Sequence, residues 1–280
     1  MKIASFEVNG RATYGVVAGE LLSEPGELFR TGYPDLRAVL EGDALAELAA
    51  TESETEHAIG SVNFLPVIPK PDKIMCIGVN YRPHVEEMGR DIPEYPVVFA
   101  RFPGSLVGHE QSIIRPQASE TLDFEGELAI VIGKTARHVS RDHALDYVAG
   151  YCCFMDGSVR DWQRHTTQFT AGKSFDRSGS MGPYLVTSDV IPDPKALSLT
   201  TLVNGEIMQR GELADLLFDI PALIEYCSTF TKLLPGDVIA TGTPGGVGAA
   251  RTPPLWLQHG DTIDVDIAGL ARLSNSVRNE

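Results

Sequence analysis

Short apolar runs with the length of a strand recur through the chain beyond residue 70, and they constrain the fold most strongly. These runs occupy residues 97–100, 128–132, 184–186, 238–240 and 263–267. Helical patterns in the same part of the chain are confined to residues 142–148, 160–168 and 220–230. Strands this numerous, without regular strand–helix alternation, predict an α+β, mainly β fold and argue against a doubly wound sheet.

The first part of the chain has a different pattern. An Asn9-Gly10 pair between alternating apolar and polar residues predicts a β-hairpin. Leucines at helical spacing predict a helix over residues 35–50, and the acidic run at 52–56 indicates a solvated connector. Prolines then stiffen the link into the next apolar run. We therefore divide the chain into a small N-terminal α/β segment, residues 1–68, and a larger domain, residues 69–280.

The charge and the missing patterns exclude several classes of protein. A net charge of −15 repels nucleic acid and anionic membranes at long range, so neither is an expected partner. No window approaches the ~18 consecutive apolar residues of a membrane span, and no signal-peptide pattern opens the chain. HExxH and GxSxG are absent, and no GxGxxG opens a helix after a strand, which disfavours zinc peptidases, α/β serine hydrolases and dinucleotide enzymes. We expect a cytoplasmic protein.

Two carboxylates lead directly into the apolar run at 128–132. Residues two apart on a strand share a face about 6.6 Å apart, so Glu125 and Glu127 project to the same side. Two buried anions on one face need a cation, and a hard divalent ion with oxygen ligands meets that need. The alternative is a strand end with two solvated acids, and Asp264 and Asp266 repeat the same spacing.

A second candidate site lies in residues 78–89. Pro83 suits the first turn of a short helix and Gly89 its end, which places His84 and Glu87 on one face. A carboxylate three residues away can orient an imidazole, as a general base requires. The alternative is an incidental ion pair on an exposed helix.

A third candidate runs from Asp156 through Arg160 and Gln163 to Lys173. If a helix begins near Arg160, that residue and Gln163 share a face and can aim donors at a developing oxyanion, and Lys173 can add a charge. Taken singly, each of these residues is more often a surface charge or a structural hydrogen bonder.

Residues 241–248, TGTPGGVG, form the last candidate. Glycines here let backbone N–H groups approach an anion, and Thr243 offers a hydroxyl. No GK[ST] follows, so the segment is not a nucleotide P-loop, and a carboxylate ligand has the right size. The alternative is a tight glycine-rich connection.

Together, in this order, the segments IGVNYRPHVEEMG, FEGELAIVIGK, MDGSVRDWQ, AGKSF and TGTPGGVG resemble the fumarylacetoacetate hydrolase (FAH) family from about residue 73 onward. The resemblance implies a mixed β-roll like the C-terminal domain of that family, a divalent metal such as Mg²⁺ (or Mn²⁺), and a homodimer. It implies that Glu125, Glu127 and Asp156 bind the metal.

The same resemblance implies roles for the other candidates. His84 and Glu87 correspond to the family's lid pair, and Arg160, Gln163 and Lys173 to the residues around its substrate. Thr243 corresponds to its glycine-loop threonine, and we expect Gly242 and Arg82 also to contact substrate. Pro83, where many members carry Asp, and Gly157, where a larger residue is common, depart from the family pattern.

The implied activity is metal-dependent cleavage of a carbon–carbon bond in an acylpyruvate-type 2-oxo acid, such as fumarylpyruvate or maleylpyruvate. His84 would deprotonate a water that attacks the distal carbonyl, and Lys173 with Gln163 or Arg160 would stabilise the oxyanion. The alternative is oxaloacetate decarboxylation or isomerisation of a 2-hydroxy-dienedioate at the same site. A more distant alternative is a ligand receptor without turnover.

Overall fold

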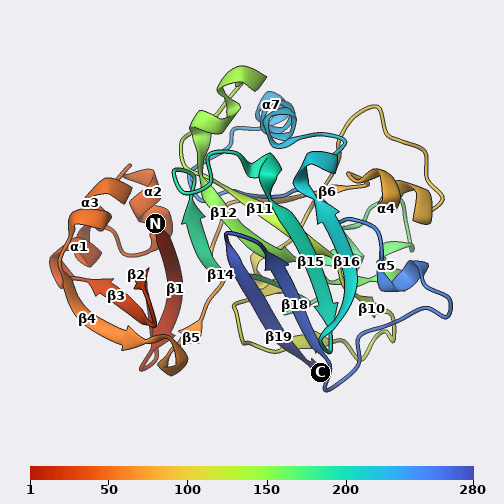
Figure 1. Ribbon diagram of the computed structural model, residues 1–280, viewed down its shortest axis with the longest axis horizontal. Coiled ribbons are helices and arrows are strands. Elements are labelled where there is room, and N and C mark those ends of the chain that lie inside the picture. Colours follow the sequence, from red (N-terminus) through yellow and green to blue (C-terminus); the bar gives the residue numbers. More distant parts are fainter.

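The computed structural model describes residues 1–280, and its centre is a 12-stranded mixed sheet (Figure 1). The strand order is β4-β3-β2-β1-β14-β12-β11-β17-β6-β7, with β5 paired to β1 and β8 to β14. The bounds are β1 Lys2–Val8, β2 Arg11–Ala18, β3 Leu21–Pro25, β4 Ser53–Ala58, β5 Asn63–Phe64, β6 Ile74–Gly78, β7 Val97–Ala100, β8 Leu106–Val107, β11 Gly126–Ile132, β12 Val148–Met155, β14 Gly179–Thr187 and β17 Val238–Ala240. The predicted mainly β fold is confirmed.

A five-stranded sheet, in the order β16-β15-β18-β19-β9, packs against one face of the central sheet. Its strands are β9 Ile113–Arg115, β15 Ser198–Val203, β16 Glu206–Glu212, β18 Thr262–Ile267 and β19 Ala271–Asn279. The short strands β10 (Leu122–Asp123) and β13 (Ser158–Val159) pair separately. Leu128 and Ile130 of β11 face the core between the two sheets, whereas Ala129 and Val131 face a second core on the opposite side. Because both faces of β11 are buried, its residues 128–132 form a continuous apolar run.

The helices are few and short, and none has the length and apolar run that crossing a bilayer requires. They are α1 Glu27–Gly32, α2 Leu36–Glu41, α3 Leu45–Ala50, α4 Arg82–Glu87, α5 Arg160–Gln163, α6 Thr170–Lys173 and α7 Ile220–Phe230. The prediction for 220–230 is confirmed; Asp219 caps this helix by accepting a hydrogen bond from Ala222 N–H.

Three of the helix predictions need correction. The helix predicted over 35–50 is two helices, because the chain turns at Gly42 and Asp43, where Asp43 takes a positive φ of 52°. Residues 141–147 form a 3₁₀ helix, and the helix predicted over 160–168 ends at Gln163. Short helical patterns define the type of element better than its length.

The N-terminal lobe, red to orange in Figure 1, begins with the predicted hairpin. Asn9 and Gly10 both have positive φ, 51° and 74°, in the two-residue turn that joins β1 to β2. The solvated connector predicted at 52–56 is wrong, because residues 53–58 form β4 on the edge of the sheet, paired with β3. Its charged side chains are exposed, and charges on an edge strand oppose unwanted pairing.

The lobe is joined to the larger body through the central sheet. Lys2 and Ile3 of β1 pair with Val186 and Leu185 of β14. Ile3 also belongs to the same core as Phe154 of β12. The division at residue 68 stays a prediction, but the sheet runs through it.

Candidate active site

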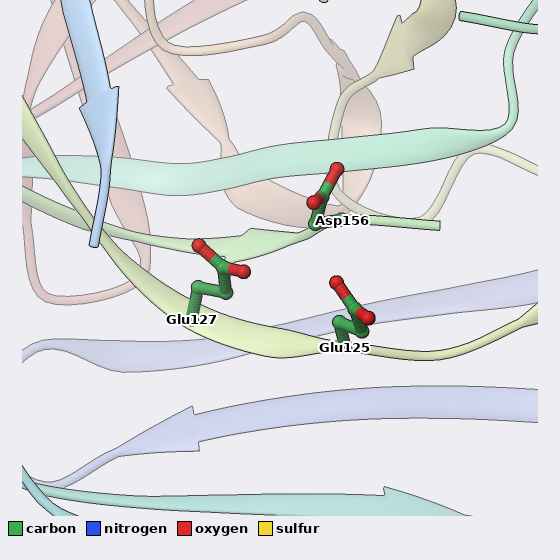
Figure 2. Close-up of side chains that lie close together, drawn as sticks. All are labelled: Glu125, Glu127 and Asp156. Atoms are coloured by element: carbon green, nitrogen blue, oxygen red, sulfur yellow. The ribbon is translucent and has the colours of Figure 1, made fainter. Parts of the chain in front are cut away.

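Three carboxylates meet where β11 begins and β12 ends (Figure 2). Gly126 pairs with Met155, so Glu125 and Glu127 on one strand lie beside Asp156, which directly follows the other. One oxygen from each of the three carboxylates lies within 4.8 Å of the others, and all three residues are buried. The two segments that the sequence analysis treated separately therefore form one cluster.

The glycine between the two glutamates is required by packing on the other face of the strand. A Cβ at Gly126 would lie 2.0 Å from Oγ1 of Thr201 on β15. Between the two acids, the strand therefore has no room for a side chain on its other face. Thr243 Oγ1 and Gln209 further fix this glycine, by bonds to its carbonyl (2.9 Å) and from its N–H (3.0 Å).

Two of the carboxylates have cations of the chain beside them. Lys173 Nζ lies 2.5 Å from Glu125 Oε2 and 2.5 Å from Asp156 Oδ2. Arg160 Nη2 lies 2.6 Å from Glu125 Oε1. Burial of Glu125 opposes ionisation, but the charges of Arg160 and Lys173 outweigh it and hold the pKa of Glu125 below its usual range.

Glu127 has no such partner. Its only hydrogen bond comes from the backbone N–H of Gly242, 2.8 Å from Oε2. Burial, followed by repulsion from Asp156 and Glu125, raises the pKa of Glu127 well above its ordinary value. A divalent cation among three carboxylate oxygens would remove that penalty, so the cluster fits a hard metal ion.

Helix α4 brings the predicted lid pair over this cluster. His84 Nδ1 lies 2.8 Å from Glu87 Oε1, and Glu87 Oε2 accepts a hydrogen bond of 2.8 Å from Gly246 N–H. His84 is 7% exposed. The segment 78–89 and the glycine loop 241–248 are therefore joined through Glu87.

A partly open pocket collects the candidate residues. Seven of the expected residues line it: His84, Glu125, Glu127, Arg160, Gln163, Lys173 and Thr243. Gln163 Oε1 accepts from Arg160 Nη1 (2.9 Å), while its amide N–H₂ has no protein partner. Arg82 is exposed on α4 and does not line the pocket, and Gly242 contacts Glu127. The structure thus brings the predicted residues together except for Arg82.

Comparison with known proteins identifies the family. Residues 73–278 match the family described as "Fumarylacetoacetate (FAA) hydrolase C-terminal". The chain belongs to the FAA hydrolase family. This member is 42% identical to "Oxaloacetate tautomerase YisK" of Bacillus subtilis, over 92% of this chain and 88% of the relative.

Solved structures of similar proteins agree with the family's fold. The member resembles a putative HpcE protein from Mycobacterium smegmatis with a TM-score of 0.90 and 32% identity, over 100% of this chain and 99% of the other. It also resembles a maleylpyruvate hydrolase from Sphingobium sp. SYK-6, solved in complex with manganese(II) and pyruvate, with a TM-score of 0.80 and 29% identity over 100% and 99% of the two chains. The predicted family resemblance is confirmed, and the protein is an enzyme of the FAA hydrolase family.

Two buried charges of this FAA hydrolase-family enzyme were missed by the sequence analysis. Arg101, 2% exposed, places Nη1 2.5 Å from Asp156 Oδ1 and 2.9 Å from the carbonyl of Gly157. It directly follows β7, and the residues around it in the sequence do not indicate that it is buried.

Asp123 is the second. It lies 2.7 Å from Arg160 Nε through Oδ2 and accepts hydrogen bonds from the N–H groups of Gly248 (2.8 Å) and Ala249 (3.0 Å). The alternation that pointed to Glu125 and Glu127 extends back to Asp123, and this was the available signal.

Proposed function

We propose that this enzyme interconverts the keto and enol forms of oxaloacetate or a close 2-oxo dicarboxylic acid by moving a proton at C3. The observation that carries the proposal is the His84–Glu87 pair. His84 lines the pocket, and the pair belongs neither to the three carboxylates that fit a metal nor to the ion pairs that Arg160 and Lys173 form with them. The 42% identical relative is named as an oxaloacetate tautomerase, which supports this reaction over hydrolysis.

The carboxylate cluster would hold Mg²⁺ or Mn²⁺. Bound to Glu125, Glu127 and Asp156, the ion would withdraw electron density from the 2-oxo group and so make the C3 hydrogens more acidic. A structural neighbour whose description includes manganese(II) and pyruvate, a 2-oxo acid, supports this pairing of metal and ligand.

His84 would transfer the proton. Nδ1 is engaged by Glu87, so Nε2 is the nitrogen free to accept the C3 hydrogen and to return it. Glu87 is held in turn by Gly246 N–H, and this chain of contacts fixes the orientation of the imidazole ring.

Lys173 and Gln163 would donate hydrogen bonds to the substrate's 2-oxo oxygen. Two of the three ammonium N–H groups of Lys173 are directed to Glu125 and Asp156, which leaves one for the substrate. The free amide N–H₂ of Gln163 offers a second donor. As the C3–H bond breaks, these donors would stabilise the enolate oxygen that gains negative charge. The proton that His84 has taken from C3 would then pass to that oxygen and complete the enol.

Hydrolysis of an acylpyruvate is the second candidate, because the same pair can deprotonate a water molecule. The neighbour named as a maleylpyruvate hydrolase, 29% identical, supports it. Oxaloacetate decarboxylation is the third, since it needs the electron withdrawal but no proton transfer from C3. The expected homodimer stays a prediction.

The test compares the reactions in one set of variants. With Mg²⁺, exchange of the C3 hydrogens of oxaloacetate with deuterium and the loss of enol absorbance should be accelerated by the wild-type enzyme. His84→Ala should lower the rate by about 10² or more, and Glu87→Gln by less, because Glu87 orients the base rather than acting as one. The exposed His143→Ala and Glu86→Gln are matched controls and should behave as wild type.

Parallel assays measure hydrolysis of fumarylpyruvate and maleylpyruvate and release of CO₂ from oxaloacetate. Hydrolysis faster than tautomerisation in the wild-type enzyme would overturn the proposal in favour of the second candidate. Wild-type tautomerisation by His84→Ala would show that the pair does not carry the proton.

A further inference from the structure

Three cationic side chains line the pocket, and they differ in their partners. Arg160 and Lys173 are buried and lie within 2.6 Å of carboxylates of the cluster. Arg90 also lines the pocket, but it forms no ion pair and no side-chain hydrogen bond in the structure. Its guanidinium N–H groups therefore remain available for a ligand.

The position of Arg90 is nevertheless defined. Its backbone N–H bonds to the carbonyl of Val85 (3.0 Å), just beyond the end of α4, after Gly89 has taken a φ of 61°. Its guanidinium lies 5.4 Å from the centre of the Phe169 ring, and that ring packs edge-on against Phe99. Stacking on an aromatic face orients a guanidinium while leaving its edge N–H groups free.

The charge of the pocket indicates what those N–H groups would bind. A 2-oxo acid placed at the carboxylate cluster uses its own carboxylate and carbonyl there. A second carboxylate at the far end of the substrate would enter a pocket whose other cations are already paired, in a chain of net charge −15. Arg90 lies at the exposed side of the pocket, and without its charge repulsion by the acidic chain would disfavour the dianion.

We propose that Arg90 is the specificity-determining residue that binds the distal carboxylate and so selects 2-oxo dicarboxylic acids over 2-oxo monocarboxylic acids. The proposal rests on the proposed function for the placement of the 2-oxo group. The planar guanidinium suits a carboxylate, which it can bind through two parallel N–H···O bonds. Because Arg90 would contact the C4 carboxylate and not the C3 hydrogen that is transferred, it acts on substrate binding more than on the proton transfer.

The test measures binding separately from turnover. Titration calorimetry with Mg²⁺ present would compare 3,3-difluoro-oxaloacetate, which has no C3 hydrogen and cannot enolise, with pyruvate, which has no distal carboxylate. Arg90→Met should weaken binding of the dicarboxylate by about 10- to 100-fold and leave pyruvate binding within about twofold, as expected for the loss of one hydrogen-bonded charge pair. Arg90→Lys should recover part of the loss, because it keeps the charge without the planar pair of donors.

Kinetics provide the second readout. Arg90→Met should raise KM for oxaloacetate more than it lowers kcat, and Arg278→Met, an exposed arginine on β19, should change neither. Equal losses for both ligands, or none for either, would overturn the assignment. Ligand discrimination by an enzyme that fails to tautomerise oxaloacetate would instead refute the proposed function and leave the role of Arg90 intact.

Discussion

Two strands of this protein carry a pair of acids with one residue between them. Glu125 and Glu127 enter β11, and Asp264 and Asp266 lie on β18. In β18 the residues between and beside the acids face the core, so both aspartates point away from it. Asp266 is 36% exposed and pairs with Arg272 at 2.7 Å on the surface. In β11 both faces are buried, and the acids are only 5% and 1% exposed.

The difference teaches that spacing alone does not identify a metal site. What distinguishes the two pairs is whether the face that carries the acids is covered, and by which charges. Glu24 in the N-terminal lobe extends the comparison, because it is buried too but has Arg11 (2.7 Å), Arg30 (2.9 Å) and His57 (2.9 Å) as partners. Glu127 is buried without a cation of the chain, and this is the condition that a metal ion would relieve.

The largest effect is expected from Glu127→Gln. The substitution removes a charged oxygen ligand from the cluster, so Mg²⁺ or Mn²⁺ affinity, measured by calorimetry, should fall by at least about 10²-fold, and metal-dependent activity should fall with it. Asp266→Asn has the same chemistry on the exposed pair and should leave both unchanged. Full activity of the wild-type enzyme after exhaustive chelation would show that the cluster does not work through a metal.

Much of the site is encoded locally, which is why the sequence could predict it. The alternation along a strand placed Glu125 and Glu127 on one face, and the spacing of three residues placed His84 beside Glu87. The hairpin at Asn9 follows from a turn that requires positive φ at both positions. Each of these inferences uses contacts between residues that are close in sequence.

The missing parts depend on contacts between distant segments. Arg101 reaches Asp156 across 55 positions, and nothing near Arg101 in the sequence indicates that partner. The acidic run became β4 because β3 offers it an edge, which the charges alone do not reveal. Arg82 shows the opposite error. Its place in the motif, two residues before His84, suggested a contact with substrate, but on the helix its side chain is exposed to solvent.

A smaller effect is expected from Arg101→Lys. Asp156, unlike Glu127, is paired with cations of the chain, and this substitution tests what that pairing contributes to metal binding. Arg101 donates to Asp156 Oδ1, to the carbonyl of Gly157 and to Ser178 Oγ (3.0 Å), so it fixes the direction of the Asp156 carboxylate. Lysine keeps the charge but cannot make these contacts together. Metal affinity should therefore drop by about tenfold, the loss typical of a partner that orients a ligand.

The readout for Arg101 separates orientation from general damage. Thermal unfolding without metal should change less than the metal-dependent increase in melting temperature. If Arg101→Lys binds Mg²⁺ as tightly as wild type, the orientation of Asp156 does not depend on this arginine, and Lys173 alone determines it.

Glu24→Gln is expected to leave the metal site unchanged. It should instead change how the stability of the fold depends on pH. Burial opposes ionisation of Glu24, but hydrogen bonds from Arg11, His57 and Thr13 and the charge of Arg30 outweigh it, and they lower its pKa to about 2. Because this pKa is lower in the folded than in the unfolded chain, the ionised carboxylate stabilises the fold above about pH 4.5. That contribution is lost as the pH falls toward 2.

In urea unfolding at pH 7, Glu24→Gln should be less stable than wild type by about 2 kcal/mol, and the two proteins should converge as the pH is lowered from 4.5. A difference that stays constant down to pH 2.5 would mean that the charge of Glu24 does not stabilise the lobe. A loss of Mg²⁺ affinity in this variant would mean that the lobe and the carboxylate cluster are coupled through the shared sheet.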